Sequence, residues 1–211
     1  MDKIELLAPA GNMESLVAAL NNGADAVYLG AKQFNARGKV KNFDFDELQE
    51  ATNLAHLHNA KVYLTTNTLV FDDEISNIIE IVKSALKAGV DAFIVQDIGL
   101  VDILKKHFPD IEIHASTQMG INNVSGAKIA KSLGITRVVL SRETPLEEIK
   151  KIKQQTNLDI EYFIQGALCV CFSGNCYESG VLFNASGNRG KCLQLCRLPY
   201  TASQNGKILS I

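Results

Sequence analysis

The chain has 211 residues, of which 46% are hydrophobic and 21% charged, enough to bury one large core or two small ones. Its formal net charge is −2 and its pI is near 6.1, which argues against a general affinity for nucleic acid but is compatible with a local basic patch. Without a secretory pattern at the start or an apolar run long enough to cross a membrane, we expect a cytoplasmic protein with reduced cysteines and no membrane partner.

Short apolar runs alternate with amphipathic stretches through most of the chain. A glycine followed by an apolar run recurs at Gly23, Gly89 and Gly134, which indicates repeated βα units. Further strands are expected at 4–8, 61–65, 112–115 and 159–164. The expected helices are 12–21 with Asn12 as its cap, 46–58, 74–88, 125–133 and 146–156, the last with Thr144 as cap and Pro145 in the first turn.

Buried strands that alternate with helices predict a parallel sheet, and seven βα steps favour a (β/α)8 TIM-type barrel. A Rossmann fold would need G-x-G-x-x-G after the first strand, and that motif is missing. The eighth step is missing too, because the end of the chain reads as a hairpin around Asn205 and Gly206. We therefore expect an incomplete barrel over 1–168 and a cysteine-rich lobe over 169–211. Two explanations are possible: the barrel is open, or the chain is a piece of a longer protein and is truncated before the last barrel strand. We favour the second explanation, because an open barrel would leave two edge strands unpaired.

Polar residues mark the expected carboxyl ends of the strands, where barrels of this class carry their working groups. They are Asn67, His114, Gln118, Arg142 and Glu143. Such a ring can bind a polar small molecule or the edge of a nucleobase. The alternative is that loop starts are polar because they meet solvent and cap helices.

The loop 32–43 holds four cations and two aromatic residues. Cations can neutralise phosphates and aromatic rings can stack on unpaired bases, so the loop is a candidate RNA contact. Its candidate residues are Lys32, Phe34, Arg37, Lys39 and Lys41. The alternative is a solvated loop whose phenylalanines anchor it to the core.

All the cysteines lie between 169 and 196. Cys169 and Cys176 form one pair, Cys192 and Cys196 another, and a fifteen-residue loop joins the pairs. Four thiolates suit a cubane iron–sulfur cluster or structural zinc, and free or catalytic thiols are a third interpretation. Cys171, between two apolar residues, is expected to be a core thiol, although it could replace a neighbouring ligand.

Several motifs together resemble the collagenase-like peptidase family U-thirty-two across essentially the whole chain. They are E-x-F-x-x-G-A-L-C at 161–169 with S-G-x-C at 173–176, E-L-L-A-P-A-G at 5–11, G-A-D-A-V-Y-L-G at 23–30, F-N-A-R at 34–37, H-A-S-T-Q at 114–118, and N-R-G-x-C-x-Q-x-C-R at 188–197.

The resemblance implies a barrel-like catalytic domain and a four-cysteine [4Fe–4S] cluster in a protein longer than this chain. Cys169, Cys176, Cys192 and Cys196 fall on the ligand positions, and Cys171 falls on a non-ligand position. Members of the family have been labelled proteases, or are required for oxygen-independent hydroxylation of a tRNA wobble uridine, of a ribosomal RNA cytidine or of a ubiquinone precursor. The opening motifs resemble the tRNA branch most.

We therefore expect an RNA-modification enzyme that converts the wobble uridine of tRNA to 5-hydroxyuridine. Its further partners would be a small-molecule hydroxyl donor and a related partner subunit, and the cluster would relay electrons or bind the oxygen donor. Arg37 would contact phosphate, whereas Asn67, His114 and Gln118 would orient the base or co-substrate. Arg142 and Glu143 would form a charge and proton pair.

Two other functions remain open on the sequence. A peptidase fits poorly, because neither H-E-x-x-H nor G-x-S-x-G is present and only a pair such as Cys171 with His114 is arithmetically available. The other is a non-catalytic scaffold that binds a partner subunit and holds structural zinc.

Overall fold

The computed structural model describes residues 4–36, 41–166 and 168–209, and its centre is one parallel sheet. Seven short strands lie side by side in the order of the chain, and each pairs in parallel with the next. They are β1 (Leu7–Pro9), β2 (Ala26–Gly30), β3 (Lys61–Thr66), β4 (Ala92–Val95), β5 (Ile113–Ala115), β6 (Arg137–Val139) and β7 (Asp159–Glu161).

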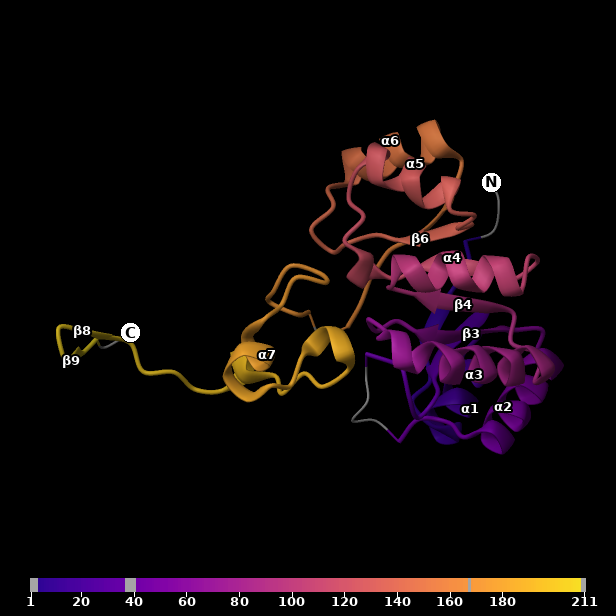
Figure 1. Cartoon of the computed structure of the whole chain (residues 1–211), viewed down its shortest axis with the longest axis horizontal. Helices are drawn as coiled ribbons and strands as arrows, with labels where there is room; N and C mark the ends of the chain where they lie inside the picture. Colours follow the sequence, from indigo (N-terminus) through magenta and orange to yellow (C-terminus); the bar gives the residue numbers. More distant parts are fainter. Residues whose placement is uncertain (1–3, 37–40, 167, 210–211) are drawn as a thin grey trace.

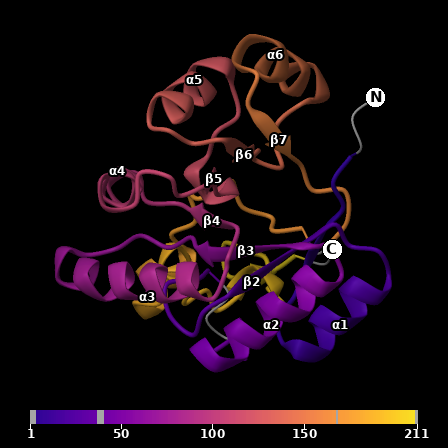
Figure 2. The same ribbon diagram turned by 90° about the vertical axis from the view of Figure 1, so that its right-hand side faces the viewer.

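Helices cover the outer side of this sheet. They are α1 (Met13–Asn21), α2 (Phe45–Leu57), α3 (Ile75–Lys87), α4 (Ile98–His107), α5 (Val124–Ser132) and α6 (Leu146–Thr156). The sheet curves, with α1 to α6 arranged around its outside (Figures 1 and 2). Right-handed crossovers between neighbouring strands put every helix on the same face, which is how a TIM-like barrel forms. The predicted fold class is confirmed: an open, TIM-like barrel of seven strands.

Of the two helix caps that the sequence predicts, one is confirmed and one is not. The Asn12 side chain caps α1 by accepting from the Ser15 N–H, as predicted. At α6 the prediction is wrong, because Pro145 itself occupies the cap position and no side chain caps the helix. The Thr144 hydroxyl is instead buried without a hydrogen-bond partner.

Helix α4 is absent from the helices that the sequence predicts. The Asp97 side chain caps this helix by accepting from the Leu100 N–H. Gly99 lies in its first turn and weakens the helical pattern there. The gap in the prediction therefore comes from a helix start that looks like a loop.

Two separate apolar clusters stabilise the barrel. The larger lies between the sheet and its helices and includes Val27, Leu64, Phe93 and Leu104. The smaller, on the opposite face of the strands, fills the interior with Ala26, Tyr63, Ala92, Ile94 and Val139. Strand residues alternate between the two faces, so each short strand contributes only one or two side chains to the interior.

A charged cluster occupies the interior at the amino ends of the strands, opposite the mouth. Glu5, just before β1, accepts from the Tyr63 hydroxyl at 2.9 Å and forms an ion pair with Arg137 of β6. The guanidinium also lies 5.2 Å from the centre of the Tyr63 ring. This pair links the first strand to the sixth across the interior, although β1 and β7 do not pair among the described residues.

His114 belongs to this end of the barrel, so its expected place at the mouth is wrong. Its side chain is fully buried, its Nε2 lies 2.9 Å from a Glu112 carboxylate oxygen, and its ring meets Tyr63 edge-on. Burial lowers its pKa although Glu112 opposes that shift. The reason is alternation: the middle residue of the three-residue strand β5 points inward, not toward the loop that follows.

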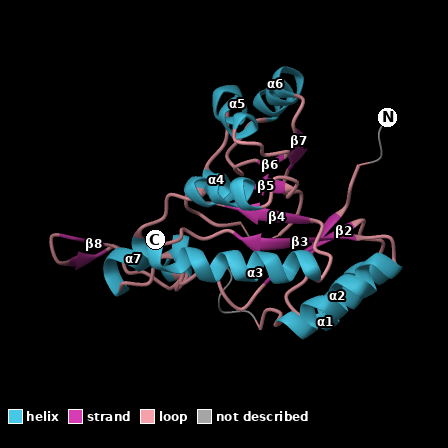
Figure 3. Ribbon diagram, turned by 45° about the vertical axis from the view of Figure 1, so that its right-hand side comes forward, coloured by secondary structure: helices cyan, strands magenta, loops and turns pink. Residues whose placement is uncertain are grey.

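A lobe of mainly irregular chain follows the sheet (Figure 3). It contains α7 (Glu178–Phe183), the 3₁₀ turns Gly187–Arg189 and Leu195–Arg197, and an antiparallel hairpin of β8 (Ser203–Gln204) and β9 (Lys207–Ile208). The predicted hairpin at Asn205 and Gly206 is confirmed, and it projects away from the rest of the molecule (Figure 1). Across the described residues, no helix combines the length and apolar character that crossing a membrane requires.

Glu161 at the end of β7 predicts a pH-dependent stability. Burial, together with the nearby Glu5 carboxylate, raises its pKa to about 7 although Arg137 opposes the shift. Between its ordinary pKa of 4.5 and about 7, the unfolded chain has released this proton while the folded chain still holds it. Stability therefore falls as pH rises through that window.

We expect Glu161→Gln to remove this dependence and stabilise the protein by on the order of 3 kcal/mol above pH 7. The measurement is the unfolding free energy of both proteins from about pH 5 to about pH 8. Glu112→Gln is the contrast, because His114 lowers the pKa of Glu112 and its loss should act in the opposite direction. Parallel curves for wild type and Glu161→Gln would contradict the prediction.

Candidate active site

The cysteine-rich lobe covers the mouth of the barrel and is anchored on two sides. On the first side, Arg189 forms two hydrogen bonds to the Glu74 carboxylate, at 2.6 and 2.7 Å, and one to the Leu69 carbonyl at 2.7 Å. Its guanidinium also lies 4.1 Å above the Phe71 ring, and the Leu69 N–H donates to the Asn188 carbonyl. Hydrogen bonding to Arg189 lowers the pKa of Glu74 to about 2, so this anchor persists in weak acid.

The second anchor lies beyond the ends of β5 and β6. Glu143 accepts from the Ser173 N–H at 3.1 Å and from the Ser173 hydroxyl at 3.3 Å. The hydroxyl of Thr117, in the turn after β5, lies 3.4 Å from the Ser173 hydroxyl oxygen. One carboxylate after β6 therefore fixes the loop between Cys171 and Cys176.

Each anchor includes a glycine that lets two backbones touch. A Cβ on Gly174 would lie 1.9 Å from the Gln118 carbonyl oxygen, and a Cβ on Gly190 would lie 2.4 Å from the Asn35 carbonyl oxygen. Both glycines also have positive φ angles, so a side chain would be strained as well as obstructed. The lobe sits at a backbone-to-backbone distance that only glycine permits.

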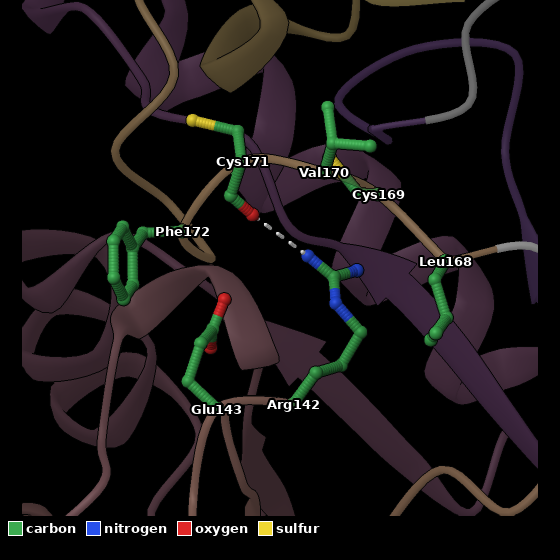
Figure 4. A pocket seen from close by; sticks show the side chains of 7 residues that line it. All are labelled: Arg142, Glu143, Leu168, Cys169, Val170, Cys171 and Phe172. Carbon is green, nitrogen blue, oxygen red and sulfur yellow. Dashed lines mark hydrogen bonds between the residues drawn. The ribbon is translucent and has the colours of Figure 1, made fainter.

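A pocket of about 220 Å³ opens between the second anchor and the first cysteines. Its lining is Arg142, Glu143, Leu168, Cys169, Val170, Cys171 and Phe172. In Figure 4 the Arg142 guanidinium extends toward the Cys171 carbonyl, to which it donates at 3.3 Å, and the Glu143 carboxylate points between Arg142 and Phe172. The structure thus brings together the predicted proton pair and one predicted metal ligand, Cys169.

Asn67 and Gln118 lie at the mouth, as expected, but outside this lining. The Asn67 side chain accepts from the Ala36 N–H at 3.0 Å and lies 3.5 Å from the Ser116 hydroxyl, so it ties the loop after β2 to the end of β5. Gln118 belongs to the 3₁₀ turn Thr117–Met119, and the Gln118 carbonyl oxygen contacts Gly174. Both residues support the rim, whereas His114 belongs to the opposite end of the barrel.

The described part of the candidate RNA-binding loop favours a structural role for three of its residues. Lys32 and Lys41 form exposed ion pairs with Asp44 and Glu47, at 3.1 and 3.3 Å, at the start of α2. Phe34 packs against the core. The remaining two candidates, Arg37 and Lys39, lie outside the described residues.

The cysteine thiols are all free, and those of Cys169 and Cys196 are exposed. Burial and the neighbouring Cys176 and Cys169 thiols raise the pKa of the Cys171 thiol, so three of the cysteines lie close together. Nevertheless, within 4–36, 41–166 and 168–209 no three Cys, His, Asp or Glu side chains are arranged to hold a metal ion.

The donor chemistry of the lobe still suits a thiolate-bound centre. Four free thiols come from two segments, and Arg197, beside Cys196, donates to the carbonyl of Leu168, beside Cys169. That contact links the segment that holds Cys196 to the segment that holds Cys169. The residues that could hold a metal are therefore Cys169, Cys176, Cys192 and Cys196, with their side chains regrouped around it.

Sequence reasoning missed the residues that attach the lobe. Ser173 and Arg189 lie inside the motifs S-G-x-C and N-R-G, but nothing in a motif says which distant side chain it meets. Phe172, which the sequence shows only as an apolar neighbour of Cys171, forms a wall of the pocket. A polar residue between closely spaced glycines and cysteines is the one signal that could have indicated an anchor.

The fold and site define a βα-barrel protein whose mouth is covered by a cysteine-rich lobe. The chain belongs to peptidase family U32, whose sequence profile matches residues 11–208. This finding confirms the family resemblance of the motifs.

Relatives with assigned names include RNA-modifying proteins. The chain is 42% identical over 209 residues to a 23S rRNA 5-hydroxycytidine synthase of Escherichia coli K12, covering 99% of this chain and 31% of that protein. It is 37% identical over 202 residues to tRNA hydroxylation protein P1 of Bacillus subtilis 168, covering 96% of this chain and 48% of that protein. The chain thus spans about a third and about half of the length of these two relatives.

Among solved structures, a U32 peptidase matches with a TM-score of 0.65 at 13% identity, over 76% of this chain and 68% of that one. At this identity the likeness shows the fold alone. It agrees with the TIM-like arrangement of the strands and helices.

Replacing Arg189 should detach one side of the lobe. We expect Arg189→Ala to destabilise the protein by about 2 kcal/mol, because charge-assisted hydrogen bonds to Glu74 are lost and a carboxylate is left unpaired. Limited proteolysis read by mass spectrometry should show faster cleavage in residues 162–209, with the helical circular dichroism retained. Lys207→Ala in the exposed hairpin is the control. An unchanged cleavage pattern in Arg189→Ala would show that the anchor is dispensable.

Proposed function

We propose that this chain is the barrel-and-lobe part of an iron–sulfur-dependent enzyme that hydroxylates RNA. One observation carries the proposal: the charge and proton pair of Arg142 and Glu143 faces a cysteine segment across a small pocket at the barrel mouth. The names of the two relatives, an rRNA 5-hydroxycytidine synthase and a tRNA hydroxylation protein, support RNA as the substrate.

We further propose that the RNA substrate is tRNA and that the enzyme converts its wobble uridine to 5-hydroxyuridine. The opening motifs of the chain resemble that branch of the family, and several relatives carry the name tRNA hydroxylation protein, among them P1 of Bacillus subtilis and P of Escherichia coli and Helicobacter pylori. Arg37 and Lys39 of the loop after β2 remain the proposed phosphate contacts. Lys32 and Lys41 keep a smaller role, because ion pairs already hold them.

Glu143 and Arg142 have complementary tasks in this proposal. Hydroxylation at C5 exchanges a C–H bond for a C–O bond. If a small-molecule donor gives up its hydroxyl group and receives hydrogen, atoms and electrons balance without molecular oxygen. Glu143 can accept and return the proton, and Arg142 can stabilise negative charge that develops on the base or the donor. Asn67 and Gln118 hold the rim that positions both reactants.

Cys169, Cys176, Cys192 and Cys196 are the proposed ligands of a [4Fe–4S] cluster. A bound cluster would supply one-electron transfer to a site next to the pocket. Cys171 lies beside two of these residues and is the natural competitor for a ligand position. Zinc is the alternative metal, and a colourless protein with stoichiometric zinc would favour a scaffold that binds a related partner subunit.

A thiol peptidase would need a histidine beside a cysteine, and none of the four histidines is placed that way. His56, His58 and His107 lie at the ends of α2 and α4, and His114 meets Glu112 inside the barrel. The Nδ1 of His114 has no hydrogen-bond partner, so the pair of Cys171 with His114 does not form. The family name and the names of two relatives, an uncharacterised protease of Methanocaldococcus jannaschii and a collagenase of Porphyromonas gingivalis, support proteolysis. Gelatin cleavage that survives removal of contaminating proteases would revive this alternative.

Substituting a ligand should remove the metal before it affects the fold. We expect Cys176→Ser, purified without oxygen, to lose most of its iron and the absorbance near 400 nm while keeping its circular dichroism. Cys171→Ser is the matched control and should retain iron. Equal iron in all three proteins, or zinc without iron in the wild type, would contradict the cluster assignment.

Glu143→Gln tests the proton pair separately from the anchor. A glutamine oxygen can still accept from the Ser173 N–H, so the lobe should stay in place. We expect hydroxylated nucleoside in a deletion strain to fall by about 10²-fold or more, the range for losing a general acid or base. Ser173→Ala keeps the carboxylate and should lose far less. Nucleoside mass spectrometry measures both, and normal modification with Glu143→Gln would overturn the assignment.

A further inference from the structure

One wall of the mouth pocket is an exposed aromatic ring. The Phe172 side chain is 70% exposed, and its neighbours in the lining, Val170 and Leu168, are 73% and 64% exposed. Exposed apolar side chains gathered around a pocket mark a place where a ligand or partner is bound. Here they stand directly beside two charged groups.

The charged side of the pocket has spare hydrogen-bonding capacity. Arg142 donates to the Cys171 carbonyl, but a guanidinium carries five N–H donors. Glu143 accepts twice from Ser173, whereas a carboxylate has about four acceptor sites. A ligand edge that holds both an acceptor and a donor can therefore bind there without releasing the lobe.

The size of the pocket limits the ligand further. Its volume of about 220 Å³ is below the ~300 Å³ at which sites for larger small molecules begin. A single nucleobase fits such a space. A flat ligand suits the pocket, because the wall that Phe172 provides is an aromatic ring on which a flat ligand can stack (Figure 4).

Resting on the proposed RNA hydroxylation, we propose that this pocket binds one pyrimidine base turned out of single-stranded RNA, stacked on Phe172, with its polar edge toward Arg142 and Glu143. A pyrimidine carries a carbonyl acceptor for the guanidinium and an N–H donor for the carboxylate on the same edge. Stacking of splayed bases on aromatic rings is the common way in which proteins hold unpaired RNA. Phe172 is thus a binding residue for the substrate base.

The experiment uses the absence of tryptophan from the chain. Phe172→Trp creates a protein with one fluorescent reporter in the pocket wall. Phe183→Trp is the matched control: Phe183 is also an exposed aromatic residue of the lobe, 61% exposed, but does not line the pocket. Both proteins are titrated with oligouridylate and with oligoadenylate of equal length, and RNA binding is followed independently by polarisation of labelled RNA.

We expect oligouridylate to quench Phe172→Trp, oligoadenylate to leave it largely unchanged, and Phe183→Trp to respond to neither. In addition, Phe172→Ala should weaken oligouridylate binding roughly 5- to 150-fold, the loss of one base-stacking contact, while Phe172→Tyr should retain it.

Failure of the inference and failure of the proposed function give different results. If the wild type binds and hydroxylates RNA while Phe172→Trp is not quenched and Phe172→Ala binds normally, the stacking role is overturned and RNA hydroxylation stands. If Phe172→Trp responds equally to both RNAs, the pyrimidine preference is overturned. If the wild type neither binds nor modifies RNA, the proposed function fails and the inference fails with it.

Discussion

The bidentate contact between Arg189 and Glu74 is the interaction on which the geometry of the mouth depends. Residues 168–209 have little regular structure and expose many of their apolar side chains, so a core of their own cannot position them. Arg189 supplies the missing fixation by bonding a carboxylate and a carbonyl after β3 while covering Phe71. With that side fixed, the single carboxylate of Glu143 is enough to place the first cysteine segment over the pocket.

Charged side chains lie at both ends of the barrel, but they have different roles: those at the amino ends of the strands stabilise the fold, and those at the carboxyl ends are available for a ligand. At the amino ends, Glu5 and Arg137 form an ion pair inside the sheet, Glu5 also accepts from the Tyr63 hydroxyl, and these contacts join distant strands. At the carboxyl ends, Arg142 and Glu143 contact backbone groups of a loop and keep capacity for a ligand. Buried charges that are fully paired contribute to a unique arrangement, whereas incompletely satisfied ones in a cleft are typical of functional sites.

The sequence predicts the repeating architecture well because each βα unit is encoded locally. Glycines such as Gly23 and Gly89, both with positive φ angles, end the helices, and the apolar runs that follow them become buried strands. Prediction fails where a result depends on alternation over three residues, as at His114, or on a contact between distant segments. Arg189 and Glu74 are 115 residues apart, so no local pattern could pair them. The arrangement of the thiols is likewise a long-range property, and the spacing of cysteines indicates their chemistry but not their positions.

The two anchors of the lobe lie on different parts of an unclosed sheet, one after β3 and the other after β6. Flattening the sheet would separate these points, and the lobe would have to release at least one of them. The lobe therefore links two distant parts of the open barrel, and its docking opposes flattening of the sheet. A ligand that binds only when the lobe is docked stabilises the docked state by mass action. Such a ligand therefore also opposes unfolding of the strands beneath the lobe.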